Sequence, residues 1–324
     1  MHGFPGYEST APVPTLIQVL NGEKPANTAP IRLESVPGSR WNYSGGGYTV
    51  MQQLLLDVSK QTFPQLLHDT VLAPIGMTHS TYEQPLPSTL QSVAATPYRA
   101  DGTIVPGGAH TYPERAAAGL WTTPSDLARY ILEVQQSLDG KANHVLSQEL
   151  TRQMLTPGKG NWGLGLQIGG SPANSYFSHG GDDAGFESLF VAYEHTGDGA
   201  VVMTNAQGGS RIASQIMGSI AAAYGWPDFH PVTRTAIKVD PAILAQYVGT
   251  YQLAPTFSIT FTLDGGQLMT QATNQPKFPV FAESKTKFFL EVVDAETEFF
   301  SDAPGHVSYL ILHQNGHEIK GVRK

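Results

Sequence analysis

Apolar positions in the first part of the chain recur mainly at the three- and four-residue spacing of an amphipathic helix. Within residues 48–60 this spacing predicts a helix whose buried face is formed by Val50, Met51, Leu54, Leu55 and Val58. A second helix is predicted over 62–72, before Pro74 and Gly76. The first 38 residues instead contain six prolines, which predict loops.

A third helix is predicted from the stretch TTPSDLARYILEVQQ. Thr123 is suited to the N-cap and Pro124 to the first helical position, because that position needs no backbone N–H. Leu127, Ile131 and Val134 then follow at helical spacing and are expected to face inward.

The pattern then changes to short runs typical of strands, bounded by Gly, Asn or Asp. Such runs occupy 163–170, 176–181, 186–193 and 200–206. A helix is predicted over 211–224. Clustered strands followed by a helix favour an antiparallel sheet covered by helices, an α+β fold, over βαβ repeats.

Beyond residue 225 the chain reads first as a linker, GWPDFHP, and then as a second domain. Short strands are predicted over 256–263, 267–273, 286–293 and 306–313, with turns at Asp264-Gly265-Gly266 and Asn315-Gly316 and one helical turn at 241–247. We therefore divide the chain into a mixed domain at 1–228, a linker at 229–239 and a small all-β, barrel-like domain at 240–324.

Composition narrows the classes of function. The 324 residues carry 19 basic and 27 acidic side chains, a net charge of −8, with no Lys/Arg-rich run, which disfavours nucleic-acid binding. No apolar run approaches the roughly 20 residues of a membrane helix, and MHGFPGYEST lacks the features of a signal peptide. The absence of cysteine excludes disulfides, thiolate catalysis and cysteine-bound zinc.

Two short segments could carry chemistry. In RWNYSGGGY, residues 40–48, a glycine run enters a helix and could bind an anion, but it lacks the features of a phosphate loop. It could equally be a glycine turn with Tyr43 packed in the core. In SHGGDDAGFES, His179 precedes Gly180 and Gly181, whose bare backbone permits close approach by a ligand. The alternative there is a tight hairpin with a surface histidine.

Other kinds of site find little support in the sequence. His313 and His317 flank the Asn-Gly turn and need not converge, and no H-E-x-x-H or similar motif occurs, so neither a metal nor another cofactor is expected. Asp182, Asp183 and Glu187 cluster near His179 without defining a glycosidase pair. The lack of a G-x-S-x-G elbow argues against an α/β-hydrolase.

Taken in order, these segments resemble the serine β-lactamase and penicillin-binding-protein superfamily. The branch in question is class C-like and contains family VIII carboxylesterases, D-aminopeptidases and D-alanyl-D-alanine carboxypeptidases. Tyr43-Ser44-Gly45 resembles its second motif, and His179-Gly180-Gly181 resembles the third, H-x-G. The flanking blocks PGSRWNYSGGGYTVMQQLL, LAPIGMTHSTY, AAAGLWTTPSDLARYI and GLGLQI also match in order. The resemblance covers about residues 3–225, and the tail from Asp240 resembles a lipocalin-like β-domain of many relatives.

The resemblance implies acyl transfer from an ester, a β-lactam or a D-amino-acid peptide through a covalent acyl-enzyme. It implies Tyr43 as general base beside a cationic lysine, and His179 in the third motif's cation position. The backbone N–H of Asp182 would supply half of the oxyanion hole. Substrate-binding positions implied in the same way are Ser44, Gly45, Trp121, Gly180, Gly181 and Asp183.

The sequence departs from the family at the first motif, S-x-x-K, which should lie upstream of Tyr43. The chain contains that pattern only at Ser284–Lys287, in the β-domain, where it alternates as a strand would and is not expected to be catalytic. HGFPGY, near the start, is a phrase that follows the nucleophile region in relatives. We therefore expect the nucleophilic serine and its lysine to be absent from this chain.

Two interpretations follow from that departure. The chain is either the C-terminal part of a longer hydrolase, for which a periplasmic or secreted location is favoured, or a non-catalytic relative that binds peptides or cell-wall fragments. The first predicts uncovered apolar faces, completed by an N-terminal segment or by a homo-oligomer.

Overall fold

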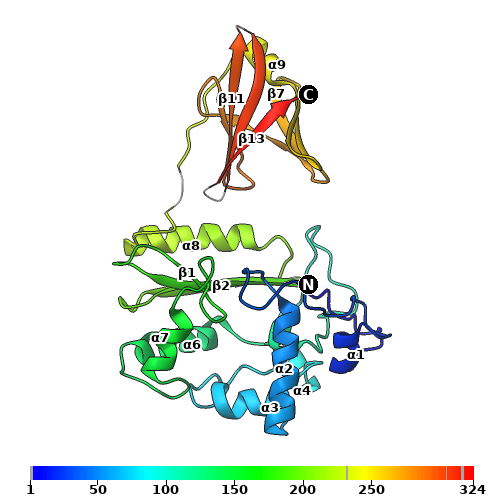
Figure 1. Cartoon of the computed structure of the whole chain (residues 1–324), viewed down its shortest axis with the longest axis vertical. Helices are drawn as coiled ribbons and strands as arrows, with labels where there is room; N and C mark the ends of the chain where they lie inside the picture. Colours follow the sequence, from blue (N-terminus) through cyan, green and yellow to red (C-terminus); the bar gives the residue numbers. More distant parts are fainter. Residues whose placement is uncertain (1–2, 231–232, 304, 315–316) are drawn as a thin grey trace. The chain divides into compact units, whose positions relative to one another are not determined.

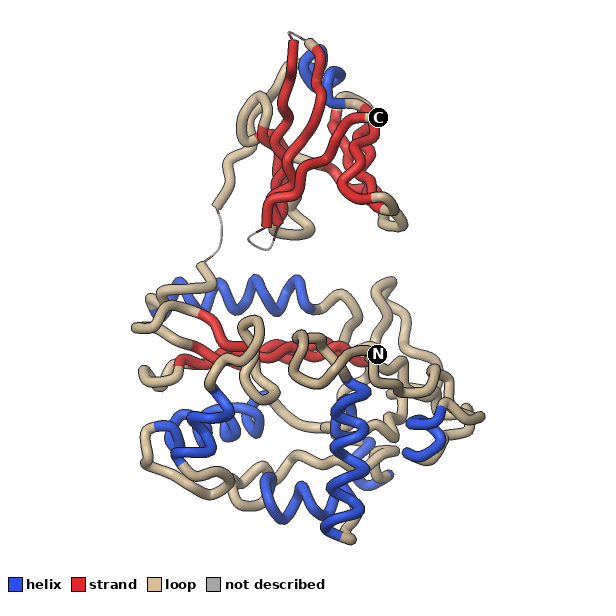
Figure 2. The backbone as a smooth tube through the Cα atoms, in the orientation of Figure 1, coloured by secondary structure: helices blue, strands red, loops and turns tan. Residues whose placement is uncertain are grey.

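The computed structural model describes residues 3–230, 233–303, 305–314 and 317–324. The chain forms two compact units, Met1–Pro231 and Val232–Lys324. Helices and an antiparallel sheet make up the first, and an antiparallel barrel makes up most of the second (Figures 1 and 2). The predicted α+β class is confirmed. The expected linker, 229–239, includes residues 231 and 232, which lie outside the described residues, as does the expected turn at Asn315-Gly316.

The sheet of unit 1 has four antiparallel strands in chain order, β1 (Gln167–Gly169), β2 (Tyr176–Asp183), β3 (Phe186–Tyr193) and β4 (Gly199–Thr204). Strand β3 alternates between two hydrophobic clusters, because successive side chains point to opposite faces. Phe190 and Ala192 pack with α6 (Pro124–Leu138) and α7 (Gln148–Leu155). Val191 and Tyr193 pack with α8 (Ser210–Tyr224) on the other face (Figure 1).

Helix α6 forms as its sequence predicts. The Thr123 side chain accepts a hydrogen bond from the backbone N–H of Asp126 at the N-cap, and Pro124 occupies the first turn. Ile131 and Val134 are buried between the helix and the sheet, with Leu127 partly buried beside them. The predicted orientation of this helix is confirmed.

Helix α2 (Gly45–Ser59) has the reverse orientation to the predicted one. Its buried residues are Gly45, Gly46, Thr49 and Gln52, which face α5 (Arg115–Ala118) and α1 (Leu16–Asn21). The residues predicted to be buried are exposed: Val50, Met51, Leu54, Leu55 and Val58. Leu54 is 60% exposed and Val58 75%. The prediction was wrong because a periodic apolar face shows which residues share a side, and says nothing of whether that side is covered.

Smaller helices complete unit 1. The first 38 residues are not all loop, because α1 forms behind a capping box in which Thr15 and Gln18 bond to each other's backbone. The predicted helix at 62–72 is split into α3 (Phe63–Leu67) and a π-helical turn, η1 (His68–Leu72). Helices α4 (Ser88–Gln91), α5 and α7 were not predicted.

Unit 2 is a nearly closed barrel. After α9 (Pro241–Tyr247), its strands are β5 (Gly249–Ala254), β6 (Phe257–Asp264), β7 (Gln267–Ala272), β8 (Lys277–Pro279), β9 (Phe281–Ala282), β10 (Lys287–Phe289), β11 (Ala295–Ala303), β12 (His306–Gln314) and β13 (His317–Arg323). The sheet runs from β8 to β9, and one residue, Val280, joins these two edge strands. The edges therefore meet, as barrel closure requires. Tyr251, Phe261 and Phe299 fill the interior.

Strand prediction in unit 2 was accurate at β6, β7 and β12 and incomplete elsewhere. The predicted strand at 286–293 shrinks to β10, and β5, β11 and β13 were missed. In β11 Glu296 and Glu298 alternate with buried positions, but one of those, Thr297, is polar, which weakens the apolar alternation. Of the helices in the described ranges, none has the length and apolar character needed to cross a bilayer.

Candidate active site

The tyrosine motif lies at the N-terminus of α2. The Ser44 hydroxyl oxygen accepts a hydrogen bond of 2.9 Å from the backbone N–H of Gly47, which caps the helix. Gly46 is buried, and a Cβ there would lie 3.1 Å from Ile31 Cγ2, so the glycine run serves close packing. Tyr43 is 39% exposed at this terminus rather than packed in the core.

The histidine motif lies on β2, where the strand has one open edge. Strand β1 pairs only with Tyr176–Ser178, whereas β3 pairs with all of β2 as far as Asp183. From His179 to Asp183 the side of β2 away from β3 therefore has no strand neighbour in the described part of the chain. Gly180 and Gly181 are exposed along this edge. Such an edge can bind an extended substrate through its backbone groups.

The fold brings the two motifs together. The ring centroids of Tyr43 and His179 lie 6.3 Å apart. Both side chains line a cavity of about 310 Å³, together with Gly45. Its remaining walls are apolar or aromatic and include Tyr48, Tyr82 and Tyr130. The sequence thus predicted two residues that share one concave site.

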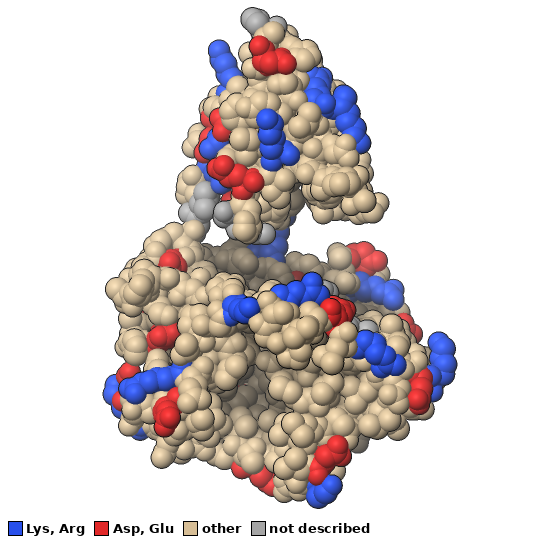
Figure 3. Space-filling view, in the orientation of Figure 1, with Lys and Arg blue, Asp and Glu red and all other residues tan. Residues whose placement is uncertain are grey.

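Other predicted site residues line a neighbouring cavity of about 450 Å³. Its walls include Trp121, Gly181 and Asp183, and it shares Leu120 with the first cavity. The Trp121 ring contacts Phe186 edge to face, with centroids 5.7 Å apart. Ser44, Gly180 and Asp182 line neither cavity. Figure 3 shows a hollow in a largely uncharged face of unit 1.

Burial shifts several pKa values in and near these cavities. It lowers the pKa of His179, which favours the neutral imidazole despite a hydrogen bond involving the Gly180 backbone. It raises the pKa of Asp183 to about 7, with a further contribution from Asp182, against a hydrogen bond from Tyr112. Partial burial raises the pKa of Asp182, and the negative charge of Glu187 raises it further. The Glu114 side chain is fully buried, and this burial raises its pKa to about 7.

Glu187 is held in a structural role. Its carboxylate accepts hydrogen bonds from the backbone N–H groups of Gly208 and Ser210 and from the Ser210 hydroxyl, at the start of α8. Burial by itself would raise the pKa of Glu187, but these bonds outweigh it and lower the pKa. A carboxylate at a helix N-terminus is also favoured by the helix dipole.

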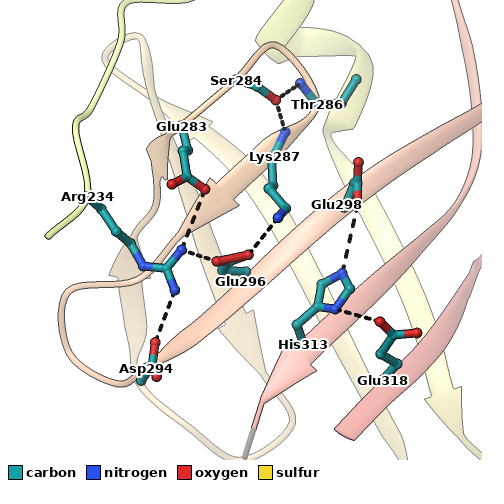
Figure 4. A network of polar contacts seen from close by, with 10 residues as sticks. All are labelled: Arg234, Glu283, Ser284, Thr286, Lys287, Asp294, Glu296, Glu298, His313 and Glu318. Carbon is teal, nitrogen blue, oxygen red and sulfur yellow. Dashed lines mark hydrogen bonds and ion pairs between the residues drawn. The ribbon is translucent and has the colours of Figure 1, made fainter. Parts of the chain in front are cut away.

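Within the described residues, no serine and no lysine line the cavity that holds Tyr43 and His179. The Ser284–Lys287 pattern lies in unit 2. There the Ser284 hydroxyl oxygen accepts hydrogen bonds from the N–H groups of Thr286 and Lys287, and Lys287 Nζ pairs with Glu296 at 3.1 Å (Figure 4). The Ser284 hydroxyl and the Lys287 ammonium therefore each bind a different partner in this domain.

Sequence reasoning missed two tryptophans beside the site. Trp162 lies 5.7 Å from Tyr43 and 5.6 Å from His179 between ring centroids, and Trp41 stacks on it at 5.5 Å. Trp41 lies two residues before Tyr43, which was the available signal. The described residues contain no group of three or more His, Cys, Asp or Glu side chains placed to hold a metal ion.

A sheet with helices on both faces, and a helix-terminal tyrosine beside a His-Gly-Gly strand, define an α+β protein of the β-lactamase and penicillin-binding class. Residues 3–222 match the Beta-lactamase family, and the chain belongs to that family. The resemblance expected from the motifs is therefore confirmed. Residues 233–323 match a domain of unknown function, DUF3471.

Several known proteins are similar to the chain. Penicillin-binding protein 4* of Bacillus subtilis (strain 168) is 22% identical over 321 residues, covering 89% of this chain and 67% of that protein. The octameric penicillin-binding protein homologue from Pyrococcus abyssi superposes with a TM-score of 0.55 at 19% identity, covering 94% and 70%. A crystal structure of SurE gives 0.52 at 17%, covering 100% and 76%. These superpositions show the fold, and the chain spans only part of each relative.

Proposed function

We propose that unit 1 forms the tyrosine and histidine half of a serine acyl-hydrolase site. The bond cleaved would be that of an ester, a β-lactam or a D-amino-acid peptide. The observation that carries the proposal is the placement of Tyr43 and His179 in one cavity, 6.3 Å apart between ring centroids. Membership of the Beta-lactamase family supports the serine-hydrolase class.

In the proposed reaction a serine oxygen attacks the carbonyl carbon of the substrate. Its proton passes to Tyr43, which acts as a phenolate beside a lysine ammonium. Tyr43 then passes this proton to the leaving group as the bond between the carbonyl carbon and that group breaks. The backbone N–H of Asp182 donates a hydrogen bond to the carbonyl oxygen as negative charge develops there. Water then attacks the acyl ester, which releases the acid and returns a proton to the serine oxygen.

We further propose that the serine and lysine come from a polypeptide segment that packs against the two adjoining cavities and places both side chains beside Tyr43. Protein interiors are close-packed, so open cavities of about 310 and 450 Å³ beside the sheet leave room for further chain. The exposed apolar face of α2 lies on the same unit and offers the surface such a segment needs. A second copy of this chain would bring the S-x-x-K pattern only at Ser284–Lys287, so the proposal requires a separate segment.

A binding function without turnover is the second candidate. It is favoured by the absence of serine and lysine from the Tyr43 cavity within the described residues. The open edge of β2 would then hold a peptide or cell-wall fragment through backbone hydrogen bonds.

Labelling with a fluorophosphonate, followed by intact mass, tests the proposal. The chain alone should give no adduct, and addition of an S-x-x-K-bearing segment from a family member should give one adduct on that segment's serine. The same mixture with Tyr43→Phe should label far more slowly. An adduct on the chain alone, at Ser44 or Ser284, would contradict the proposal. No adduct in either mixture, with saturable binding of D-alanyl peptides, would favour the binding function.

A further inference from the structure

Two tryptophans from distant segments stack beside the Tyr43–His179 cavity. The rings of Trp41 and Trp162 lie 5.5 Å apart at an interplanar angle of 25°. The other contacts of Trp162 are edge to face, with Tyr43 at 64° and with His179 at 81°. Trp162 therefore connects an outer indole ring to both side chains that the proposed chemistry uses.

The segment that carries Trp162 is held in place by its backbone. The Gly158 N–H donates to the Trp162 carbonyl at 2.7 Å, and the Ile168 N–H donates to the carbonyl of Asn161 at 2.7 Å. Lys159 Nζ donates to the carbonyl of Ser39 at 3.0 Å, which ties this segment to the one that carries Trp41. Stiff aromatic side chains on a fixed backbone lose little conformational entropy when a ligand binds.

The outer part of this aromatic group is open to solvent. Trp41 is 46% exposed and Tyr43 is 39% exposed. When an apolar group covers an aromatic surface that was exposed to water, the free energy falls, because both surfaces leave the solvent. A stack of two indoles offers a planar face, which a planar ring covers better than a branched aliphatic chain.

The charged residues nearest in sequence to the two tryptophans are cationic, which disfavours a cationic ligand. The charged side chains nearest in sequence are Arg40 and Lys159, and Glu34 is engaged with Arg40 at 3.9 Å. A site for an ammonium group normally combines aromatic faces with negative charge, so this stack is better suited to a neutral ring.

We propose that the Trp41–Trp162 stack is a specificity platform that selects substrates whose acyl group carries a neutral aromatic ring. The inference rests on the proposed function only for the position of the reacting carbonyl, between Tyr43 and His179. Trp162 lies beside both of those side chains, so it is the first part of the stack that a ring on the acyl group would meet.

Binding of two matched compounds to the full chain tests the platform without any need for a nucleophile. Phenylacetyl-D-alanine and acetyl-D-alanine differ only in the ring, and calorimetry should show the phenylacetyl compound binding about tenfold more tightly. Trp41→Leu and Trp162→Leu should each bring the ratio of the two affinities close to one. Trp226→Phe alters a buried tryptophan that packs on α8, and this variant should keep the full difference in affinity between the two compounds.

Each outcome decides the inference. Equal binding of the two compounds, or an aromatic preference that survives both leucine variants, overturns the platform. Tighter binding of the N-methylpyridinium analogue of phenylacetyl-D-alanine, whose ring is cationic, than of phenylacetyl-D-alanine itself overturns its preference for a neutral ring. If serine labelling fails even with the S-x-x-K segment while the aromatic preference persists, the proposed hydrolase fails and the platform stands. If labelling succeeds without the preference, only the platform fails.

Discussion

The side-chain amide of Gln52 joins α2 to the backbone at Ala116. Gln52 Oε1 accepts a hydrogen bond of 2.9 Å from the Ala116 N–H, while its Nε2 donates to the carbonyl of Pro113 at 3.0 Å. Gln52 is 2% exposed, so both backbone groups depend on it. This polar attachment fixes the orientation of α2 and leaves its apolar face, which includes Val50, Leu54 and Val58, turned to solvent.

We predict that Leu54→Gln combined with Val58→Gln reduces self-association without loss of stability. Both residues are exposed, so the change removes apolar surface from water contact and should shift the free energy of unfolding by no more than about 0.5 kcal/mol. Sedimentation velocity and thermal unfolding would measure the two effects. A larger loss of stability would mean that the apolar face of α2 is covered by other protein surface in solution.

The matched change on the opposite face should behave in the reverse way. Gln52→Ala leaves the Ala116 N–H and the Pro113 carbonyl buried without partners, which should cost about 1–3 kcal/mol. Its self-association should not fall. A Gln52→Ala protein as stable as the parent would show that α2 is not held by this amide.

The sequence predicted elements better than it predicted their surroundings. Thr123 and Pro124 identified the start of α6, and Phe186–Tyr193 was recognised as a strand, because capping and alternation are local properties. The burial of α2 depends instead on which segments lie beside it. Periodicity identified Leu54 and Val58 as one face, and only the fold shows that this face is exposed.

The candidate site was predictable from motif resemblance and not from spacing. Tyr43 and His179 were paired because both motifs belong to one family, and the fold places them in one cavity. Trp162 escaped prediction because its contacts with Trp41 and Tyr43 join segments distant in the sequence. Residue types alone could not show that two loops meet there.

For the complemented enzyme we predict that Tyr43→Phe lowers kcat/KM by about 10²–10⁴-fold, the usual effect of losing a general base. Tyr48→Phe is the matched control, because Tyr48 lines the same cavity and has no proposed proton to carry. It should lower the rate far less. Hydrolysis of a chromogenic ester with the S-x-x-K segment present would measure both. Equal losses in the two variants would remove Tyr43 from the chemistry.

In unit 2 we predict that Arg234→Met is destabilising by about 1–3 kcal/mol. Arg234 is bound by Glu283, Asp294 and Glu296, and its side chain and that of Glu296 are each 15% exposed (Figure 4). Burial alone would raise the pKa of Glu296, but hydrogen bonds from Arg234 and Lys287 outweigh it and lower the pKa. Without Arg234 the carboxylate keeps only Lys287.

Asp294→Asn provides the control for that prediction. The Asp294 side chain is 74% exposed, so its pair with Arg234 is screened by water and its loss should change stability little. Calorimetry of the full chain would separate the unfolding of the two units. A melting temperature of unit 2 that is unchanged by Arg234→Met would show that the surrounding carboxylates are sufficiently solvated without it.

The carboxyl of Asp183 should make the stability of unit 1 depend on pH. Burial, and then Asp182, raise its pKa from 3.8 to about 7, although Tyr112 donates a hydrogen bond to it. Between those pH values the folded chain keeps a proton that the unfolded chain has lost. The folded state then binds more protons, so stability is fully present below about pH 4 and falls as pH rises toward 7. Glu114 acts with the same sign.

We predict that Asp183→Asn removes its share of this loss. Asparagine has nearly the same shape and can still accept the hydrogen bond from Tyr112, but it never ionises. At pH 8 the variant should be more stable than the parent by about 2–4 kcal/mol, allowing for water in the cavity, and at pH 4 the two should be nearly equal. Urea unfolding at both pH values would measure this. Asp182→Asn, at an exposed position, should gain much less. An Asp183→Asn protein that is no more stable than the parent at pH 8 would mean that Asp183 is ionised and paired in the folded chain.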